Sequence, residues 1–516
     1  MRSGDTSSTR KQQTLNFTFA PIGASTVDLS LGLYYTGNIS VTWNPGIISN
    51  LYSSSANSQR LFTNTYVSTG ATGTIRGNVN LIRRITASTT GTIPLTVLAS
   101  ETSKLHSLAE FSSGATQSWQ FNMSALPSMM TTMGNGGLNT SFGSIGSSSS
   151  TNLPAGLTYF SVGGLNTMTG DITHLPTGLT TFAVSNAQGY PSTLNLTGSI
   201  NYLPPNLTTF SITGSLSTIS GDIWNLVYLA SLTNFTLLGA NSVDGDIIGL
   251  PSSLITFNVR GNNYITGDIA NIPASISYFY IAGNNTLVGD ISNLKSALTT
   301  FYITSGTNTI TGTMASLALA CPSISTFSVY GRNQITGNIA DFPATISNFN
   351  MYGYNIISGA IADIKPAMRT FYYRSFGTIT GNLNTIPSAL TTFSVSALTG
   401  NIYPGPSAGT CTIFGNIADI PNSVSYFYLS NCTGALTYTG KVWPTMDYFA
   451  ISPKSGYGLT QSQVNALLID LAAATWSGGY KVLSLAGFNA APDYGNPAVT
   501  VAIATLQTKV TLTINP

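Results

Sequence analysis

Charged residues are scarce in this chain. Lys, Arg, Asp and Glu make up 7% of its 516 residues, whereas about a quarter of an average soluble protein is charged. The formal net charge is only +2, which argues against nucleic acid as a partner because nucleic-acid binding needs a basic patch. The apolar share of 42% is enough to build a core, unlike the composition of disordered chains. Ser, Thr, Asn and Gly replace the charges, and such a surface suits the outside of cells.

Long apolar runs are also missing. No uninterrupted run approaches 18 residues, so the sequence predicts no membrane span. The opening MRSGDTSSTRKQQTLNFTF lacks the apolar region of a secretory signal, so we expect no ordinary export signal. The three cysteines are too few and odd in number for a complete disulfide set. Cys411 and Cys432 could pair, but we favour buried thiols.

A 22-residue repeat occupies most of the sequence. Its anchor is a Phe within L-x-x-F-x-[VIL], and the spacing of 22 keeps returning after insertions. An aliphatic residue or Met stands three positions before each Phe, and an apolar residue, once Tyr373, stands two positions after it. Such alternation predicts a strand with one buried face. The anchors are Phe160, Phe182, Phe210, Phe235, Phe257, Phe279, Phe301, Phe327, Phe349, Phe371, Phe393, Phe427 and Phe449.

The second half of each unit is equally regular. Ten residues after most anchors comes Gly in [ST]-G-[DN]-I, as in Thr266–Ile269, and [LI]-P often closes the unit, as at Ile272–Pro273. The whole pattern resembles the leucine-rich repeat, in the variant that reads L-S-G-x-I-P, with Phe replacing the usual Leu. One unit cannot bury its apolar face alone, so the units must stack into a solenoid with a parallel sheet.

The resemblance also implies a role for recurrent asparagines. Asn residues six positions after the anchor would form a hydrogen-bonded ladder with the backbone of neighbouring repeats, which is a structural role. These residues are Asn166, Asn241, Asn263, Asn285, Asn333 and Asn355.

The fold class we expect is a β-rich repeat solenoid with an N-terminal β-domain and a C-terminal αβ cap. Residues 1–13 form a polar arm, 14–75 a β-sandwich-like docking domain, 76–150 degenerate repeats, 151–455 about 13 repeats, and 456–516 the cap. NISVTWNPG weakly resembles PKD-like sandwiches. In the cap, Thr460 and Gln463 predict a capping box, Gly478–Gly479 a helix stop, and the segment from Pro497 a second helix followed by a strand.

Signals for catalysis and metals are poor. The two histidines, His106 and His174, have no spacing that suggests a metal pair or a nucleophile–base pair, and a glycan-cleaving carboxylate pair is not evident. We predict no enzyme and no cofactor. Stacking would align a row of Asp residues in G-D-I, which is either a cation ladder or, as we favour, simple turn chemistry. The row consists of Asp171, Asp222, Asp246, Asp268 and Asp290.

Residues at one position before, one after and three after the anchor point away from the core of a strand. Between 258 and 374 they are mostly Tyr, Asn and Arg, residue types enriched in recognition surfaces. We predict a ligand-binding concave face, while a stabilising aromatic ladder remains an alternative. The candidates are Arg260, Tyr278, Tyr280, Tyr302, Tyr330, Tyr352, Tyr372 and Arg374. Two insertions, within residues 185–197 and 394–414, leave the same edge and are either a binding edge or tolerated loops.

These features indicate an interaction scaffold. Composition and the expected lack of an export signal favour a bacteriophage virion surface protein of the tail, fibre or spike type, and the chain resembles surface proteins of Bacteroidetes-type bacteria and their phages. Its N-terminal region would dock on other virion proteins, with the chain forming a homo-oligomer in the particle, and its repeats would bind a host surface glycan or protein. We expect no nucleic acid partner and no membrane insertion. The alternative is a bacterial cell-surface adhesin.

Overall fold

The computed structural model describes residues 121–515, except 136–140, 165–166, 187–193, 215, 305, 399–408 and 480, together with Leu108 and the strands before residue 120. The polar arm up to residue 12 therefore lies outside the described residues. The chain divides into two compact units, one of residues 1–245 and 249–263 and the other of residues 246–248 and 264–516.

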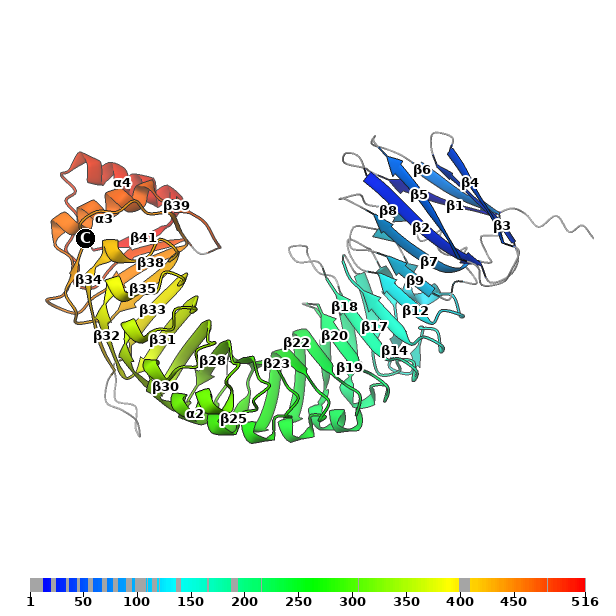
Figure 1. Cartoon of the computed structure of the whole chain (residues 1–516), viewed down its shortest axis with the longest axis horizontal. Coiled ribbons are helices and arrows are strands. Elements are labelled where there is room, and N and C mark those ends of the chain that lie inside the picture. The colour runs from blue at the N-terminus through cyan, green and yellow to red at the C-terminus, as the bar shows by residue number, and fades with distance from the viewer. Residues whose placement is uncertain are drawn as a thin grey trace, which may run out of the picture. The chain divides into compact units, whose positions relative to one another are not determined.

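The first unit begins with antiparallel strands (Figure 1). One sheet has the order β10-β8-β1-β6-β3-β4, and β2 pairs antiparallel with both β5 and β7. The strands are β1 (Gln13–Phe19), β2 (Ser25–Leu33), β3 (Gly37–Trp43), β4 (Ile47–Ser53), β5 (Gln59–Tyr66), β6 (Thr72–Gly77), β7 (Ile82–Thr89), β8 (Leu95–Val97) and β10 (Ser118–Trp119).

Strand β7 joins this β-domain to the repeats. It pairs in parallel with β9 (Glu110–Ser113), which pairs in parallel with β12 (Thr132–Asn135). The register places Ile85 beside Phe111, Phe111 beside Met133, and Met133 beside Phe160. Phe111 and Met133 therefore hold the anchor position of two earlier coils. The repeat pattern did not include these coils, because Met133 is not a Phe and the spacing between neighbouring anchors varies here.

Each later coil of the first unit has an inner strand and an outer strand, and most coils then have a 3-10 turn. The inner strands are β16 (Tyr159–Val162), β18 (Thr181–Ser185), β20 (Thr209–Thr213), β22 (Asn234–Asp246) and β23 (Thr256–Asp268), the last two running on into the outer part. The outer strands are β11 (Phe121–Asn122), β13 (Ser141–Ser144), β17 (Thr167–Asp171), β19 (Asn195–Ser199) and β21 (Thr218–Asp222). Strands β14 (Gly146–Ser147) and β15 (Ser150–Thr151) form a separate antiparallel pair. The turns are η2 (Met123–Ala125), η3 (Ile200–Tyr202), η4 (Ile223–Tyr228) and η5 (Ile247–Gly249).

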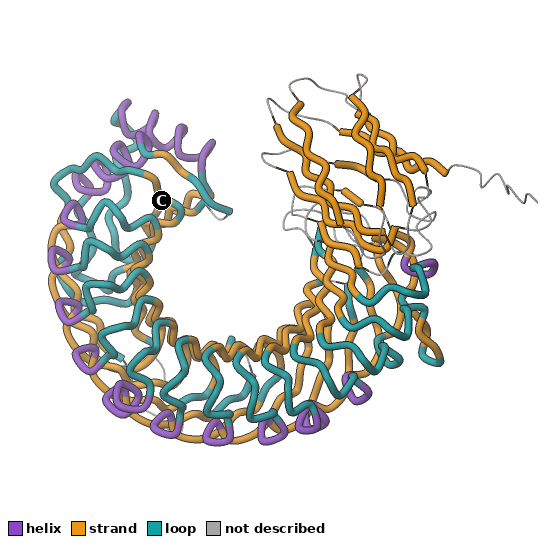
Figure 2. Tube along the Cα trace, turned by 45° about the vertical axis from the view of Figure 1, so that its right-hand side comes forward, coloured by secondary structure: helices purple, strands orange, loops and turns teal. Residues whose placement is uncertain are grey.

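The second unit repeats the same coil. Its inner strands are β24 (Tyr278–Gly283), β26 (Thr300–Ile303), β28 (Thr326–Gly331), β30 (Asn348–Ala360), β31 (Thr370–Phe376), β33 (Thr392–Ala397), β35 (Tyr426–Ser430) and β38 (Tyr448–Ser452). Its outer strands are β25 (Thr286–Asp290), β27 (Thr309–Thr313), β29 (Gln334–Asn338), β32 (Thr378–Asn382), β34 (Thr410–Asn416) and β36 (Leu436–Thr437). The short strand β37 (Thr445–Met446) precedes β38 and pairs in a separate sheet with residues 475–476. Its turns are η6 (Ile269–Asn271), η7 (Ile291–Asn293), α2 (Met314–Ala320), η8 (Ile339–Asp341), η9 (Ile361–Asp363), η10 (Leu383–Thr385) and η11 (Ile417–Asp419), which Figure 2 shows on the side of each coil away from the inner strands.

The anchor phenylalanines form the core of the solenoid. Parallel register puts each directly beside the next, as in Phe279 beside Phe301, and all are essentially inaccessible to solvent. The ring centroids of neighbouring anchors in the second unit lie 5.4–6.4 Å apart, from Phe279–Phe301 to Phe427–Phe449. The predicted β-rich leucine-rich-repeat solenoid is therefore confirmed, with a stacked aromatic core in place of leucine.

The Asp row caps turns, as the preferred alternative predicted. The Asp268 carboxylate accepts a hydrogen bond from the Ala270 backbone nitrogen at 2.9 Å, and Asp290 accepts one from Ser292 at 2.8 Å. Asn338 does the same in its own repeat, so a neutral amide serves equally well. These side chains act as N-caps of 3-10 turns, where Asp and Asn satisfy otherwise unpaired donors. Gly is required beside them, because a Cβ on Gly289 would lie 2.1 Å from an Asp268 oxygen.

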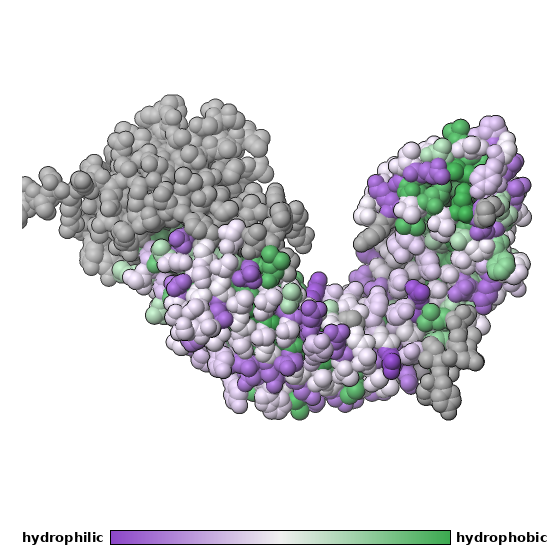
Figure 3. All heavy atoms as spheres, turned by 180° about the vertical axis from the view of Figure 1, so that it is seen from behind, coloured by the Kyte–Doolittle hydropathy of each residue, from purple (hydrophilic) through white to green (hydrophobic). Residues whose placement is uncertain are grey.

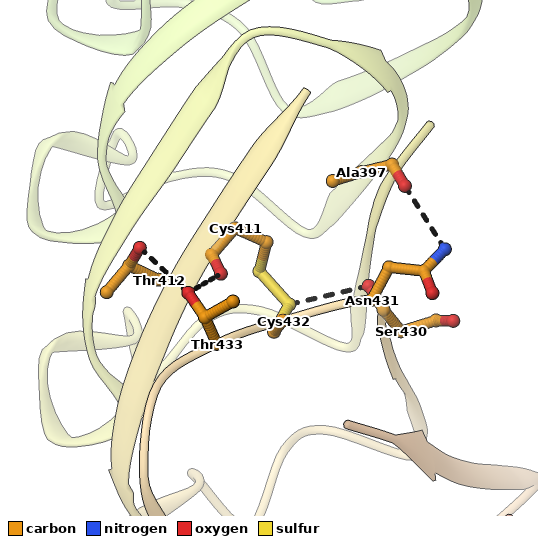
Figure 4. Close-up of a disulfide and its surroundings, with 7 residues drawn as sticks. All are labelled: Ala397, Cys411, Thr412, Ser430, Asn431, Cys432 and Thr433. Atoms are coloured by element: carbon orange, nitrogen blue, oxygen red, sulfur yellow. Dashed lines mark hydrogen bonds between the residues drawn. A yellow bond between two sulfur atoms is a disulfide. The ribbon is translucent and has the colours of Figure 1, made fainter. Parts of the chain in front are cut away.

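The preference for buried thiols was wrong for two cysteines. Cys411 and Cys432 form a disulfide, drawn in Figure 4, whereas Cys321 is a buried free thiol. Cys411 lies four residues before Gly415, as Asn263 does before Gly267, so the disulfide occupies the asparagine position of its coil. Sequence spacing left this pairing open because three cysteines allow several arrangements.

Two helices and three short strands form the C-terminal cap. Helix α3 (Gln461–Ala473) begins with the predicted capping box of Thr460 and Gln463, but it ends at Ala473 before the short strand β39 (Thr475–Trp476). The predicted stop at Gly478–Gly479 was therefore wrong by about a turn. Helix α4 (Pro497–Lys509) and strand β41 (Thr511–Ile514) follow as predicted, and β41 pairs in parallel with β40 (Val482–Leu485).

Candidate functional site

In the second unit, the outward positions of the inner strands carry tyrosines. Successive side chains of a strand point to opposite faces, so the residues next to each buried anchor are presented to solvent. We call this surface the tyrosine face. It consists of Tyr278, Tyr280, Tyr302, Tyr330, Tyr352, Tyr372, Arg374, Tyr426, Tyr428 and Tyr448.

Parallel register brings several predicted site residues into contact. Tyr280 lies beside Tyr302, with ring centroids 4.3 Å apart. Tyr330 stacks on Tyr352 at 5.9 Å, and the Arg374 guanidinium lies 5.5 Å from the centre of the Tyr352 ring. Such a cation–π contact holds the guanidinium over the ring, and a guanidinium has five N–H donors that a ligand can use.

A second group of rings lies on later strands of the same sheet, β35 and β38. Tyr426 stacks on Tyr448 at 4.5 Å, and Tyr428 meets Tyr448 edge-to-face at 6.2 Å. These three residues obey the same spacing rule from their anchors, so the signal was present in the sequence. The site prediction omitted them because it stopped at residue 374, before the insertion that lengthens the next repeat.

The phenol groups of the tyrosine face influence one another's titration. Burial, followed by the neighbouring phenols of Tyr302, Tyr372 and Tyr280, raises the pKa of Tyr330 to about 12. Burial and the phenols of Tyr428 and Tyr372 likewise raise the pKa of Tyr448. Tyr372 therefore acts on both groups of rings, and together they form a dense set of neutral hydroxyls over apolar plates.

Small residues lie beneath the tyrosines. Ser328 stands in register between Tyr302 and Asn350 and is fully buried, although its position points away from the core. Its hydroxyl has no hydrogen-bond partner among the described residues. Ser394, between Tyr372 and Tyr428, is also buried, with 1% exposure. The tyrosine face thus contains recessed hydroxyls, and an unpaired buried hydroxyl costs about 1–3 kcal/mol unless a water or ligand satisfies it.

Charge is almost absent from this face. Among the outward positions of the described inner strands, from β24 to β38, Arg374 is the single charged side chain. The remaining residues are Tyr, Thr, Ser, Asn and Ala. Figure 3 shows the same tendency on one side of the molecule, where pale, weakly polar residues cover much of the described surface. A neutral ligand would therefore meet no electrostatic barrier here.

Arg260, the remaining predicted site residue, belongs to the first unit. Its Nε donates a hydrogen bond to the side-chain oxygen of Asn258 at 3.2 Å. The outward positions around it are small, such as Ser211 and Thr236. The predicted binding edge falls largely on residues 187–193 and 399–408, which lie outside the described residues.

Catalytic groups are not gathered at the tyrosine face. His174 is exposed on the first unit, and His106 lies outside the described residues. Within the part of the chain that the structure describes, no three His, Cys, Asp or Glu side chains lie close enough together to hold a metal ion. In that same part, no helix is long and apolar enough to cross a membrane.

The stacked coils and their parallel inner strands define a leucine-rich-repeat solenoid. No protein-family model matches the sequence, and no curated protein matches it. Similar solved structures include a plant peptide hormone receptor, RGFR1, in complex with RGF2, with 15% identity over 81% of this chain and 72% of that one, at a TM-score of 0.43. Another is the circular leucine-rich-repeat protein CroV588, with 12% identity, 75% and 71% coverage and a TM-score of 0.27.

A third similar structure is a plant ice-binding protein, with 15% identity over 50% of this chain and 60% of that one, at a TM-score of 0.19. Likenesses this weak identify no ligand for this chain.

Proposed function

We propose that this chain is a non-enzymatic binding protein whose tyrosine face contacts a surface glycan or a protein loop. The observation that carries the proposal is the clustering of tyrosine rings around recessed hydroxyls on a face with a single charge. Tyr offers a large rigid surface at low entropic cost and a polar tip. A structural aromatic ladder accounts for the stacking, but it does not call for a buried, unpartnered Ser328 hydroxyl.

The setting we propose is the surface of a bacteriophage particle, as a tail, fibre or spike protein. The low charge and the Ser-, Thr-, Asn- and Gly-rich composition support a protein exposed to the medium. In this arrangement the N-terminal β-domain docks on other virion proteins, with several copies per particle, and the repeats face the host.

The disulfide favours a second candidate, a bacterial cell-surface adhesin. Disulfides form and persist in oxidising compartments and are rare in the cytosol, where phage particles assemble. Cys411–Cys432 is therefore readily explained by export, whereas a virion protein would have to be oxidised after lysis.

Peptide mass spectrometry of gradient-purified virus particles and of washed host envelopes separates the two settings. The virion proposal predicts peptides from residues 14–80 and from 250–380 in the particles. Peptides confined to the envelopes would contradict it and leave the adhesin. In either sample, the fraction of Cys411 protected from alkylation without reduction reports whether the disulfide forms.

A further inference from the structure

An open groove of about 740 Å³ lies in the first unit, at the ends of inner strands β18, β20, β22 and β23. It is formed by residues three to five positions after the anchors, among them Thr213, Leu238, Ala240 and Asn262. Its volume is within the usual range for small-molecule sites, roughly 300–1,000 Å³. The tyrosine face belongs to the second unit, so this groove is a separate feature.

Glycines create the groove. Gly214, Gly239 and Gly261 each stand four residues after an anchor and all line it. A Cβ on Gly239 would lie 2.2 Å from the carbonyl oxygen of Gly214, and Gly239 has a φ of +147°. Successive coils approach so closely at these glycines that side chains do not fit there. The backbone of the glycines therefore forms the bottom of the groove.

The groove is uncharged and offers both polar and apolar contacts. Asn262 is exposed at one side, and Asn186 and Thr213 are half-buried. Amides and hydroxyls can each donate and accept hydrogen bonds, which matches the hydroxyl groups of a sugar. Leu238 and Ala240 provide the apolar surface against which the C–H face of a pyranose ring packs.

A peptide fits this lining less well. Extended peptides are commonly held by main-chain pairing to an open strand edge. Here the backbone is already bonded between coils, since Asn186 N donates to Thr213 O at 3.3 Å and Gly214 N to Leu238 O at 3.1 Å. Charged peptides would also find no partner in a groove lined without Lys, Arg, Asp or Glu.

We propose that this groove is a binding site for a short neutral oligosaccharide. Asn262 and Thr213 hydrogen-bond sugar hydroxyls, and Leu238 with Ala240 supports the ring. The inference rests on the geometry of the first unit and does not depend on what the tyrosine face binds, so either proposal can fail alone.

The test is saturation-transfer NMR followed by calorimetry on the full chain, with gluco-, manno-, xylo-, galacto- and chito-configured trisaccharides as probes. We expect at least one to bind the wild type. Ala240→Trp, which fills the groove, should weaken binding at least tenfold, and Asn262→Ala should weaken it several-fold. Asn284→Ala is the matched control, because Asn284 is exposed at the same repeat position of the second unit, and it should bind like the wild type.

Three results would overturn the proposal. One is that no trisaccharide binds the wild type. Another is that Ala240→Trp and Asn262→Ala, each with wild-type circular dichroism, bind as well as the wild type. The third is that binding is lost in Asn284→Ala or in Tyr280→Ala to the same extent, because the sugar would then occupy a different surface. Since Asn262 is exposed, its variant retains the fold even if the Trp variant does not.

Discussion

The side-chain oxygen of Asn285 accepts a hydrogen bond from the backbone nitrogen of Ile265, in the preceding repeat, at 3.0 Å. Equivalent bonds occur along the array, for example from Val243 N to Asn263 and from Ile335 N to Asn355. Each asparagine is fully buried. The bonds satisfy backbone donors where each coil passes from its inner to its outer part, and they tie each coil to the next.

Asn285→Ala should destabilise the second unit by about 1–3 kcal/mol, because it leaves the buried Ile265 nitrogen without an acceptor. Chemical denaturation followed by circular dichroism measures the change. Asn284→Ala removes the adjacent but exposed amide and should change stability by less than about 0.5 kcal/mol. Equal effects of the two substitutions would show that the ladder bond contributes nothing.

Tyr373 takes over the ladder in one coil. Its hydroxyl accepts a hydrogen bond from Ile357 N at 3.3 Å and donates one to Phe376 O. Tyr373→Phe keeps the ring but leaves both buried backbone groups unpaired, so we expect a loss of about 1–3 kcal/mol in the same denaturation assay. Tyr372→Phe, at the half-buried outward neighbour, is the control. If Tyr373→Phe is as stable as that control, the Tyr373 hydroxyl does not take the place of a ladder asparagine.

The disulfide should stabilise the coils around the second insertion. Closing a loop with a sequence separation of 21 residues removes unfolded-state entropy worth about 3 kcal/mol in the chain-entropy model. Cys411→Ser with Cys432→Ser should therefore unfold at lower denaturant than the oxidised wild type and match the reduced wild type. Cys321→Ala is the control: it keeps the disulfide, so its unfolding should remain sensitive to reductant, as in the wild type. Wild-type unfolding that is unaffected by reductant would contradict the prediction.

The tyrosine face should be detectable by alkaline titration. The pKa of Tyr330, raised to about 12 from an ordinary value of 10.0, means that the folded state holds this proton more tightly than the unfolded state. Its contribution to stability is complete below about pH 10 and is lost as the pH rises towards 12. Phenolate absorbance of the wild type should show a late-titrating component that Tyr330→Phe removes. An unchanged curve would contradict the raised pKa of Tyr330.

Much of the repeat could be predicted because it depends on local rules. The Phe anchors, the turn-capping Asp residues and the ladder asparagines each recur at fixed spacing, and every coil imposes the same packing. Asn308 escaped the asparagine rule because it stands seven residues after its anchor, yet its side chain still accepts from Leu287 N at 2.9 Å. One extra residue in the turn shifts the count without changing the bond.

Other features depend on contacts between distant parts of the sequence. Met133 serves as an anchor because its neighbours in the sheet, Phe111 and Phe160, place it there. The groove beside Ala240 arises from glycines in successive coils, which no single repeat reveals. A single strand predicts that its outward-pointing residues are exposed. Ser328 is buried instead, because its neighbours in the tyrosine face cover it.

We propose that the tyrosine face is the contact surface of the protein. The most direct test measures the binding of fluorescently labelled protein to intact cells of the host. It compares the wild type with the double variant Tyr280→Ala, Tyr302→Ala. Tyr202→Ala with Tyr228→Ala is the control, since both are exposed tyrosines on turns of the first unit. The account predicts that, with unchanged circular dichroism, binding falls at least tenfold in the first pair and stays at wild-type level in the second. Undiminished binding by the first pair would contradict it.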